Sequence, residues 1–239
     1  MEARITMWFD NVPDGGSWAH LWFGYIICGD CSGIRTVAGN CPACGSPPPI
    51  AREHVVRLAD GTERTVRDAF MGAEARYEDW IYLRMLEREW KRPLSNIELL
   101  SDVPDSMRPS TRASVVLIFW SYFETRIDRL FRQGMSGIPN AVQEDLLRRY
   151  ATIGARLDRL YRIVFASTYW SDLVELGFDQ VAGLLQTVQN KRNEFAHGEP
   201  AAIDDILVNK VVASLRNEHE GWIAVFNKRA AKRTTQSPP

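Results

Sequence analysis

Arg192 and His197, five positions apart, are the residues of this chain whose types and spacing could do chemistry. They end a segment that carries an apolar stripe at the spacing of a helix, and Arg192 falls on that stripe. The stripe consists of Phe178, Val181, Leu185, Val188 and Phe195. A guanidinium on a buried stripe is costly unless it meets an anion, so this position calls for a carboxylate, a phosphate or a water-filled cleft.

The position of the end of this predicted helix determines whether the side chains of Arg192 and His197 could approach each other. Asn193 and His197 are four residues apart and share one helix face, whereas Arg192 lies about 140° around the helix from His197. Gly198 and Pro200 are expected to end the helix. His197 is therefore expected on the last turn, where its ring can swing toward Arg192 and where the negative end of the helix dipole favours a protonated imidazole.

Together with Gly198, these residues resemble the Arg-Asn-x-x-x-His motif of the HEPN superfamily, many of whose members are RNases. The resemblance covers residues 110–228 and implies a helical bundle in which two protomers join their motifs into one composite site. It implies a metal-independent endoribonuclease, in which a ribose 2′-hydroxyl attacks the neighbouring phosphate and leaves a 2′,3′-cyclic phosphate. His197 would be the general acid or base, Arg192 would stabilise the phosphate charge, and Asn193 would orient the scissile group or its partner histidine.

The same resemblance implies RNA as the substrate, a homodimer, and a role as a toxin or phage-defence effector. An inhibitor protein is a possible partner. In HEPN toxins silenced by a nucleotidyltransferase, a tyrosine two positions after the histidine is modified, and Glu199 occupies that position here. That mode of control is therefore not expected. Because some HEPN domains bind without cleaving, the alternative is a noncatalytic adaptor that binds protein or nucleic acid.

Glu124 is a further candidate for the catalytic site. Its helical neighbours are apolar, so its carboxylate is expected to be partly desolvated and to need a partner. HEPN domains often carry an acidic or polar residue that faces the catalytic pair, and Glu124 is the candidate for that role. The alternative is a structural salt bridge, with Arg192 itself as the partner.

Three more segments are predicted to be helical, which makes the fold mainly α. One covers residues 110–132, a second opens at Pro139, and a third follows the motif. Their inner faces are Val116, Trp120, Phe123, Ile127 and Leu130 in the first, Val142, Leu146, Tyr150, Ile153, Leu157, Leu160 and Val164 in the second, and Val208, Val211, Leu215, Trp222 and Phe226 in the third. Four helices with short connections are what an up-and-down, HEPN-like bundle needs.

Three arginines at helical spacing, Arg149, Arg156 and Arg159, form an edge that could follow an RNA backbone. The alternative is an ordinary solvated face, because Asp145 and Asp158 are interspersed with them.

The chain's four cysteines form two CxxC pairs, Cys28 with Cys31 and Cys41 with Cys44. Each tight turn can present two thiolates, and four soft ligands suit tetrahedral zinc. The pattern predicts a small β zinc ribbon with a structural Zn²⁺, because four protein ligands leave no open position for catalysis. A disulfide pair or a redox CxxC is the alternative. Only Arg35 adds positive charge between the cysteines, so a structural or partner-recognition role is expected.

The predicted organisation has four parts. Residues 1–50 form the zinc ribbon, with strands expected from residues 18–27, and residues 51–109 supply a hairpin, an aromatic-rich helix and a loop. Residues 110–228 form the helical bundle, and residues 229–239 read as a disordered basic tail. No internal repeat is evident.

Composition limits the function classes. A formal net charge of −1 gives no global attraction to nucleic acid, so RNA binding would rest on a local patch. The longest strongly apolar run, residues 115–120, is too short to span a bilayer, and the N-terminus lacks the pattern of a signal peptide. A cytoplasmic protein without membrane contact is expected, and in that compartment paired CxxC motifs favour metal over disulfide.

Overall fold

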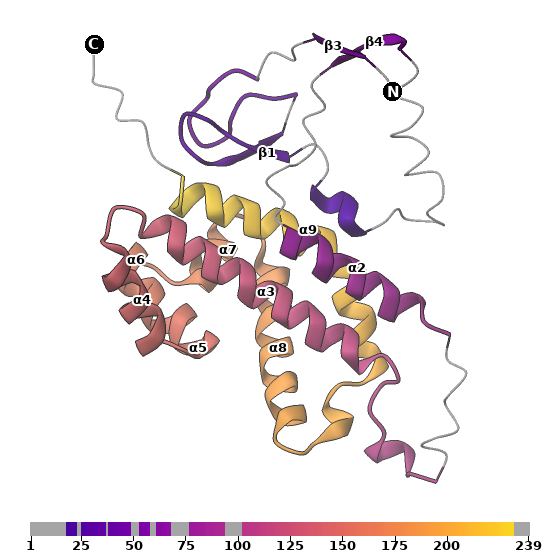
Figure 1. Ribbon diagram of the computed structural model, residues 1–239. Coiled ribbons are helices and arrows are strands. Elements are labelled where there is room, and N and C mark those ends of the chain that lie inside the picture. The colour runs from indigo at the N-terminus through magenta and orange to yellow at the C-terminus, as the bar shows by residue number, and fades with distance from the viewer. Residues whose placement is uncertain are drawn as a thin grey trace. The chain divides into compact units, whose positions relative to one another are not determined.

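The computed structural model of this chain describes residues 18–22, 25–36, 38–48, 53–57, 61–67, 77–93 and 102–231. The protein is mainly helical, with small antiparallel hairpins toward the N-terminus (Figure 1). It divides into two compact units, with the boundary along the chain between Trp80 and Ile81. None of the helices described combines the length and the apolar content that crossing a bilayer requires.

The first unit contains the short 3-10 helix η1 (Trp18–Trp22) and two hairpins. β1 (Tyr25–Ile27) pairs antiparallel with β2 (Ile34–Thr36), with Ile27 opposite Ile34. Strands were expected across residues 18–27, but among the residues described there only Tyr25–Ile27 form a strand, and Trp18–Trp22 form a 3-10 helix. The predicted hairpin on either side of Gly61 is confirmed, because β3 (Glu53–Arg57) pairs antiparallel with β4 (Glu63–Arg67).

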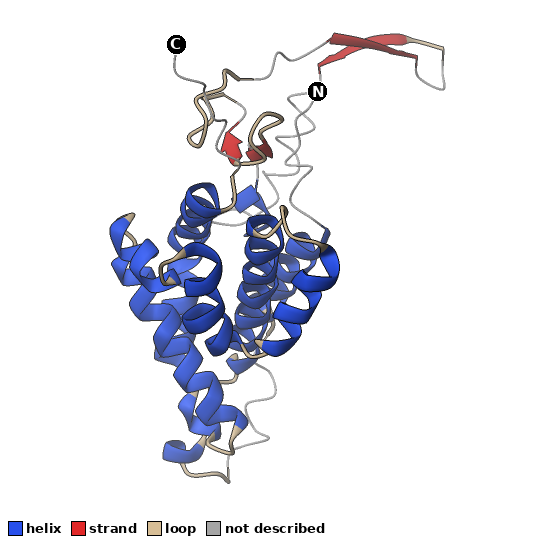
Figure 2. Cartoon of the chain, turned by 90° about the vertical axis from the view of Figure 1, so that its left-hand side faces the viewer, coloured by secondary structure: helices blue, strands red, loops and turns tan. Residues whose placement is uncertain are grey.

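The second unit is built from helices that run alongside one another (Figure 2). Its described elements are α2 (Tyr77–Lys91), which begins before the unit boundary, η3 (Asp105–Met107), α3 (Ala113–Gly134), α4 (Asn140–Arg149), α5 (Ile153–Ala155), the π-helical segment η4 (Arg156–Leu160), α6 (Tyr161–Phe165), α7 (Tyr169–Glu175), α8 (Asp179–Ala196), η5 (Pro200–Ala202) and α9 (Asp205–Arg229). The expected aromatic-rich helix corresponds to α2, and residues 68–76 lie outside the described part.

α3 and α9 supply the core of this unit. α3 contacts α6, α8 and α9, and the apolar stripes predicted for both α3 and α9 are confirmed. The buried stripe residues are Val116, Trp120, Phe123, Ile127 and Leu130 in α3 and Val208, Val211, Leu215, Trp222 and Phe226 in α9. Both helices therefore fold around apolar faces that the sequence already specifies.

The prediction of a single helix after Pro139 is wrong, because the helix is interrupted at Tyr150. α4 ends at Arg149, and the Thr152 hydroxyl then accepts a hydrogen bond from the backbone N–H of Ala155, which starts the next helical segment. The expected inner face is also displaced in α4. Its Leu147 is 4% exposed, whereas Val142 is 46% exposed.

The arginine after the break explains how the interruption is tolerated. The Arg156 guanidinium donates to the Tyr150 carbonyl at 2.9 Å and to the Leu147 carbonyl at 3.4 Å, and it pairs with Asp128 at 3.1 Å. These bonds satisfy carbonyls that the end of α4 leaves without helical partners. An apolar spacing that continues through residues 142–164 carries no sign of this break, because the hydrogen bonds of Arg156 depend on tertiary structure.

One ion pair links α3 to α9 inside the core. Arg126 of α3 donates from Nη2 to the two carboxylate oxygens of Glu218 at 2.6 and 2.5 Å, and the two side chains are 0% and 1% exposed. The Arg126 guanidinium carbon lies 3.9 Å from the ring centroid of Tyr122 and 5.5 Å from that of Trp222. The charge is therefore enclosed by a carboxylate and by aromatic faces, which makes it compatible with an apolar core.

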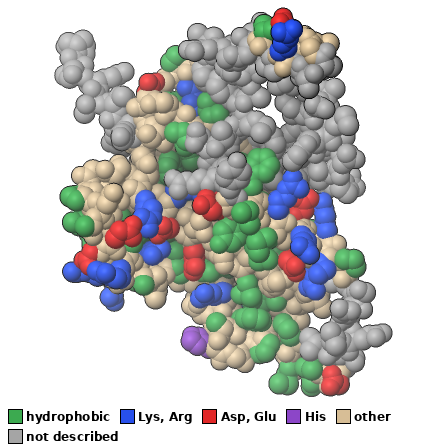
Figure 3. Space-filling model, in the orientation of Figure 1, with side chains coloured by type: hydrophobic (Ala, Val, Ile, Leu, Met, Phe, Trp, Pro, Cys, Tyr) green, Lys and Arg blue, Asp and Glu red, His purple; other side chains and the backbone are tan. Residues whose placement is uncertain are grey.

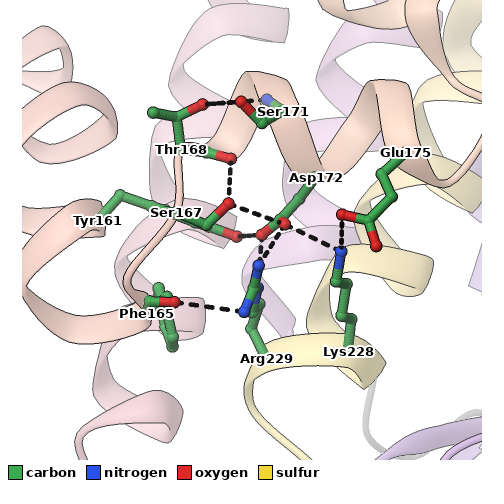
Figure 4. Close-up of polar contacts among 9 residues, drawn as sticks. All are labelled: Tyr161, Phe165, Ser167, Thr168, Ser171, Asp172, Glu175, Lys228 and Arg229. Carbon is green, nitrogen blue, oxygen red and sulfur yellow. Dashed lines mark hydrogen bonds and ion pairs between the residues drawn. The ribbon is translucent and has the colours of Figure 1, made fainter.

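A second polar cluster joins α6, α7 and the end of α9 (Figure 4). Asp172 of α7 accepts hydrogen bonds from the Tyr161 hydroxyl at 2.5 Å and from Arg229 at 2.6 and 2.5 Å. Lys228 lies 3.1 Å from Asp172 and 2.7 Å from Glu175. The expectation of a disordered tail from residue 229 onward is thus wrong at Arg229, which ends α9 and is ion-paired. Residues 232–239 lie outside the described part.

We expect Glu218→Leu to lower the free energy of unfolding by about 3–5 kcal/mol, because the buried Arg126 loses its counter-charge. Replacing both partners, as in Arg126→Met with Glu218→Leu, should cost much less, because no charge then remains buried. Urea unfolding followed by helical circular dichroism measures both effects, with the exposed Glu220→Gln as control. A double variant as unstable as Glu218→Leu would contradict the pairing of charges as the reason.

The stability contributed by Asp172 should depend on pH. Burial by itself raises the pKa of Asp172, but hydrogen bonds from Arg229, Tyr161 and Lys228 outweigh it and lower the pKa to about 2. Because the pKa is lower in the folded state, the contribution is present above the unfolded pKa near 4 and is lost as the pH falls through about 2. We therefore expect Asp172→Asn to lower the urea midpoint at pH 7 and to lose this difference toward pH 2. A difference that stays constant over this range would contradict the assignment.

Candidate functional site

The motif residues lie at the C-terminal end of α8, with His197 directly after the last helical residue, Ala196. The backbone N–H of His197 donates to the carbonyls of Asn193 at 3.0 Å and Glu194 at 3.1 Å. Gly198 has φ +99°, a left-handed conformation that glycine adopts without a steric penalty. The backbone N–H of Glu199 then returns to the Glu194 carbonyl at 3.1 Å, which closes the helix end.

The accessibility of the motif follows from where the apolar stripe ends. Val181, Leu185 and Val188 are buried, but Phe195 is only half-buried. Arg192 is accordingly half-buried, not enclosed in the core as its place on the stripe predicts, and Asn193 and His197 are exposed. The guanidinium, the amide and the imidazole can therefore all be reached from solvent.

The partner of Arg192 is its neighbour in the chain. Its Nη1 donates to Asn193 Oδ1 at 3.2 Å, and within the described residues it has no carboxylate partner. Glu124, the acid expected to face it, instead accepts a hydrogen bond from Trp120 Nε1 at 2.6 Å, one turn earlier in α3. The structure thus brings Arg192 and Asn193 together, and it does not pair Glu124 with Arg192 in the part of the chain that it describes.

The loop after His197 is held in place by α9 and by the residues that precede α3. The Ser110 N–H donates to the Ile203 carbonyl at 2.8 Å, and the Ser110 hydroxyl donates to Asp205 at 2.5 Å. Asp204 caps α9 by accepting from the Leu207 N–H at 2.7 Å. An exposed histidine therefore lies between a regular helix and a braced loop.

The three arginines of the predicted basic edge differ in their exposure and in their contacts. Arg156 is largely enclosed and bonded within the fold, whereas Arg149 and Arg159 are exposed. Arg149 lies 2.7 Å from Asp145, which also pairs with Arg148 at 2.6 Å. Basic and acidic side chains are likewise interspersed on the face shown in Figure 3. Arg149 and Arg159 thus remain available at the surface, and Arg156 has a structural role.

The four cysteines converge on one point in the first unit. Their sulfur atoms all lie within 4.8 Å of one another, with Cys28 Sγ 3.7 Å from Cys44 Sγ and Cys31 Sγ 3.6 Å from Cys41 Sγ. A disulfide requires an S–S distance of about 2.05 Å, and these thiols are free. A tetrahedron with metal–sulfur bonds of about 2.3 Å has edges of about 3.8 Å, so the cluster has the dimensions of a four-thiolate metal site.

The two CxxC turns share one backbone design that the sequence reading did not detect. The Cys28 N–H donates to the Gly33 carbonyl at 2.8 Å, and the Cys41 N–H donates to the Ser46 carbonyl at 2.9 Å. In each turn the residue after the second cysteine is left-handed, Ser32 with φ 59° and Gly45 with φ 76°. The signal was available, because both CxxC pairs are followed by a serine and a glycine, in opposite order.

The thiols differ in their electrostatic surroundings. A hydrogen bond from the Ser46 hydroxyl, 3.0 Å from Cys44 Sγ, lowers the pKa of Cys44 to about 6. Burial raises the pKa of Cys31 and that of Cys41. Burial also acts to raise the pKa of Cys28, but backbone hydrogen bonds from Cys31 and Asp30 outweigh it and lower the pKa. Thiolates this close together repel one another, so full ionisation of the cluster calls for a bound cation.

Sequence reasoning missed the buried polar residues that organise both units. Arg126 and Asp172 lie in the helical core, and Arg35, noted only as an isolated basic residue, is 3% exposed in the first unit. Arg126 falls on the helical face that also carries Phe123 and Leu130, and this spacing is a signal that could have revealed it.

No protein-family model, curated protein or solved structure matches this chain. The functional interpretation therefore rests on two groups of residues, the end of α8 and the cysteine cluster.

Proposed function

We propose that this protein is a metal-independent endoribonuclease whose site is built on the last turn of α8. The observation that carries the proposal is the state of Arg192, which is reachable from solvent and has no carboxylate partner among the described residues. Its charge is free to bind a phosphate, and the exposed imidazole of His197 lies on the same turn.

The proposed reaction assigns one task to each motif residue. A base removes the proton of the ribose 2′-hydroxyl, the 2′-oxygen attacks phosphorus, and the bond to the 5′-oxygen breaks as that oxygen takes a proton from an acid. Arg192 stabilises the charge on the phosphate oxygens, and Asn193 orients the scissile group. The products are a 2′,3′-cyclic phosphate and a free 5′-hydroxyl.

Two proton-transfer groups are needed, and the motif of one chain supplies a single histidine. We therefore include in the proposal a homodimer in which a second copy contributes its own His197. The helices from α3 to α9 would form the HEPN-like bundle that carries both motifs. Glu124 stays a prediction, because its carboxylate is engaged with Trp120 in this structure.

The cysteine cluster is proposed to hold a structural Zn²⁺ bound by Cys28, Cys31, Cys41 and Cys44. The free thiols and the sulfur spacing of 3.6 and 3.7 Å support a tetrahedral ion. The metal would supply folding energy to the small unit and would take no part in RNA cleavage. A cytoplasmic setting, where thiols stay reduced, and a role as a toxin or phage-defence effector complete the proposal.

We expect the purified protein to cleave total RNA in the presence of chelator and to leave 2′,3′-cyclic phosphate ends. His197→Ala and Arg192→Ala should each lower the cleavage rate about 100-fold or more, because each removes a group that acts on the reacting phosphate. Analysis of the product ends together with initial rates measures both expectations.

Matched controls lie on the same helix. Lys191→Ala removes a neighbouring positive charge that is paired with Glu194, and Asn190→Ala removes an exposed amide. Neither should change the rate. A folded wild-type protein that cleaves no RNA, with or without added metal or cell extract, would overturn the nuclease and favour the noncatalytic adaptor.

We expect one zinc ion for each chain. Replacement by Co²⁺ should give the spectrum of a tetrahedral four-thiolate site, and Cys31→Ser should abolish it, because three thiolates and a hydroxyl bind the ion far more weakly. Metal analysis and absorption spectroscopy measure these results, with circular dichroism as a check that the helices persist. A protein that binds no zinc while its thiols remain reduced would contradict the assignment.

A further inference from the structure

We propose that Arg35 is the positive charge that balances the metal–thiolate cluster, and that it tunes how tightly the cluster binds its ion. The inference rests on the proposed metal at the four cysteines and deepens that assignment. Four thiolates around a divalent ion carry a net charge of −2, and a small unit that encloses such a group needs a compensating cation nearby.

Arg35 lies on β2, directly after the first CxxC turn, and is 3% exposed. Its Nη1 donates to the carbonyls of Ser46 at 3.0 Å and Pro47 at 2.7 Å. The guanidinium also donates to the carbonyls of Thr36 and Gly39. Every one of these acceptors is neutral.

Ser46 connects Arg35 to the ligands of the second turn. The Ser46 carbonyl accepts from both Arg35 and the Cys41 N–H, and the Ser46 hydroxyl lies 3.0 Å from Cys44 Sγ. Arg35 therefore extends from the strand after the first pair of ligands to the residue that contacts the second pair. Its link to the cluster runs through Ser46.

A nearby anion would account for the burial of the Arg35 charge. Backbone carbonyls satisfy its hydrogen-bonding groups, but within the described residues no carboxylate balances its charge. A buried cation without a counter-charge is destabilising, and a metal-bound cluster of four thiolates would supply that counter-charge. Binding of the metal and burial of Arg35 thus stabilise each other. Arg35 would be a positioning residue, because it acts through the ligands and not on the metal.

A purely structural role, in which Arg35 only ties the two turns together, makes a different prediction. Lysine keeps the charge but cannot bond several carbonyls at once, whereas methionine keeps the stem and loses the charge. If charge is what matters, Arg35→Lys should retain most of the metal affinity that Arg35→Met loses. If the hydrogen bonds are what matter, both variants should lose it to the same degree.

The test is competition for Zn²⁺ between the full-length protein and a chelator, with Co²⁺ absorption to confirm tetrahedral sulfur coordination. We expect Arg35→Met to weaken zinc binding about 10–100-fold and Arg35→Lys to weaken it several-fold at most. Arg57→Met, an exposed change of the same charge on β3, should leave the affinity unchanged.

A second arm varies the charge of the cluster itself. Cys44→His should reduce the net negative charge of the metal site from −2 to −1. In that background, Arg35→Met should weaken zinc binding less than it does in the wild type. Equal losses in the two backgrounds, or equal losses for Arg35→Lys and Arg35→Met, would overturn the proposal. If Arg35→Met binds no metal at all, the result for Arg35→Lys tests the proposal. Near-normal zinc binding by Arg35→Lys supports the role of charge, and no zinc binding by Arg35→Lys overturns it. A wild-type protein that binds no Zn²⁺ would instead overturn the metal assignment, and this inference with it.

Discussion

The buried ion pair between Arg126 and Glu218 sets the arrangement of the helical unit. Both charges are enclosed in an apolar core, so α3 and α9 are held in the register that brings the guanidinium and the carboxylate together. The segment that leads into α9 is tied down near α3 as well, because Ile203 and Asp205 bond to Ser110 just ahead of α3. The loop that follows His197 is therefore braced by the same two helices that the ion pair joins.

The two units are stabilised in different ways. The helical unit buries aromatic and aliphatic side chains on α3, α8 and α9, and its polar contacts decide how the elements meet. In the described part of the first unit the strands are short and few apolar side chains are buried, so burial contributes less there. Its four convergent thiols have a geometry that could hold a metal ion.

The arginines of this chain differ in the groups that they contact. Arg126, Arg156 and Arg229 each meet carboxylates inside the helical unit, and Arg35 meets backbone carbonyls. Arg192 differs, because its described contact is a neutral amide beside solvent. A guanidinium with this freedom, on the same helix end as an exposed histidine, is the basis of the proposed phosphate site.

The sequence by itself determined what depends on short-range pattern. The apolar stripes of α3 and α9, the end of α8 at Gly198 and the convergence of the cysteines all follow from residue type and spacing. Tertiary structure decided how the break at Tyr150 is held, because Arg156 beyond it pairs with the distant Asp128, and it left Arg192 half-buried although its spacing places it on the buried stripe. The same holds for the ion-paired end of α9. A charged side chain carries no local sign of its partner, so only the folded chain shows which charges are paired and which remain free.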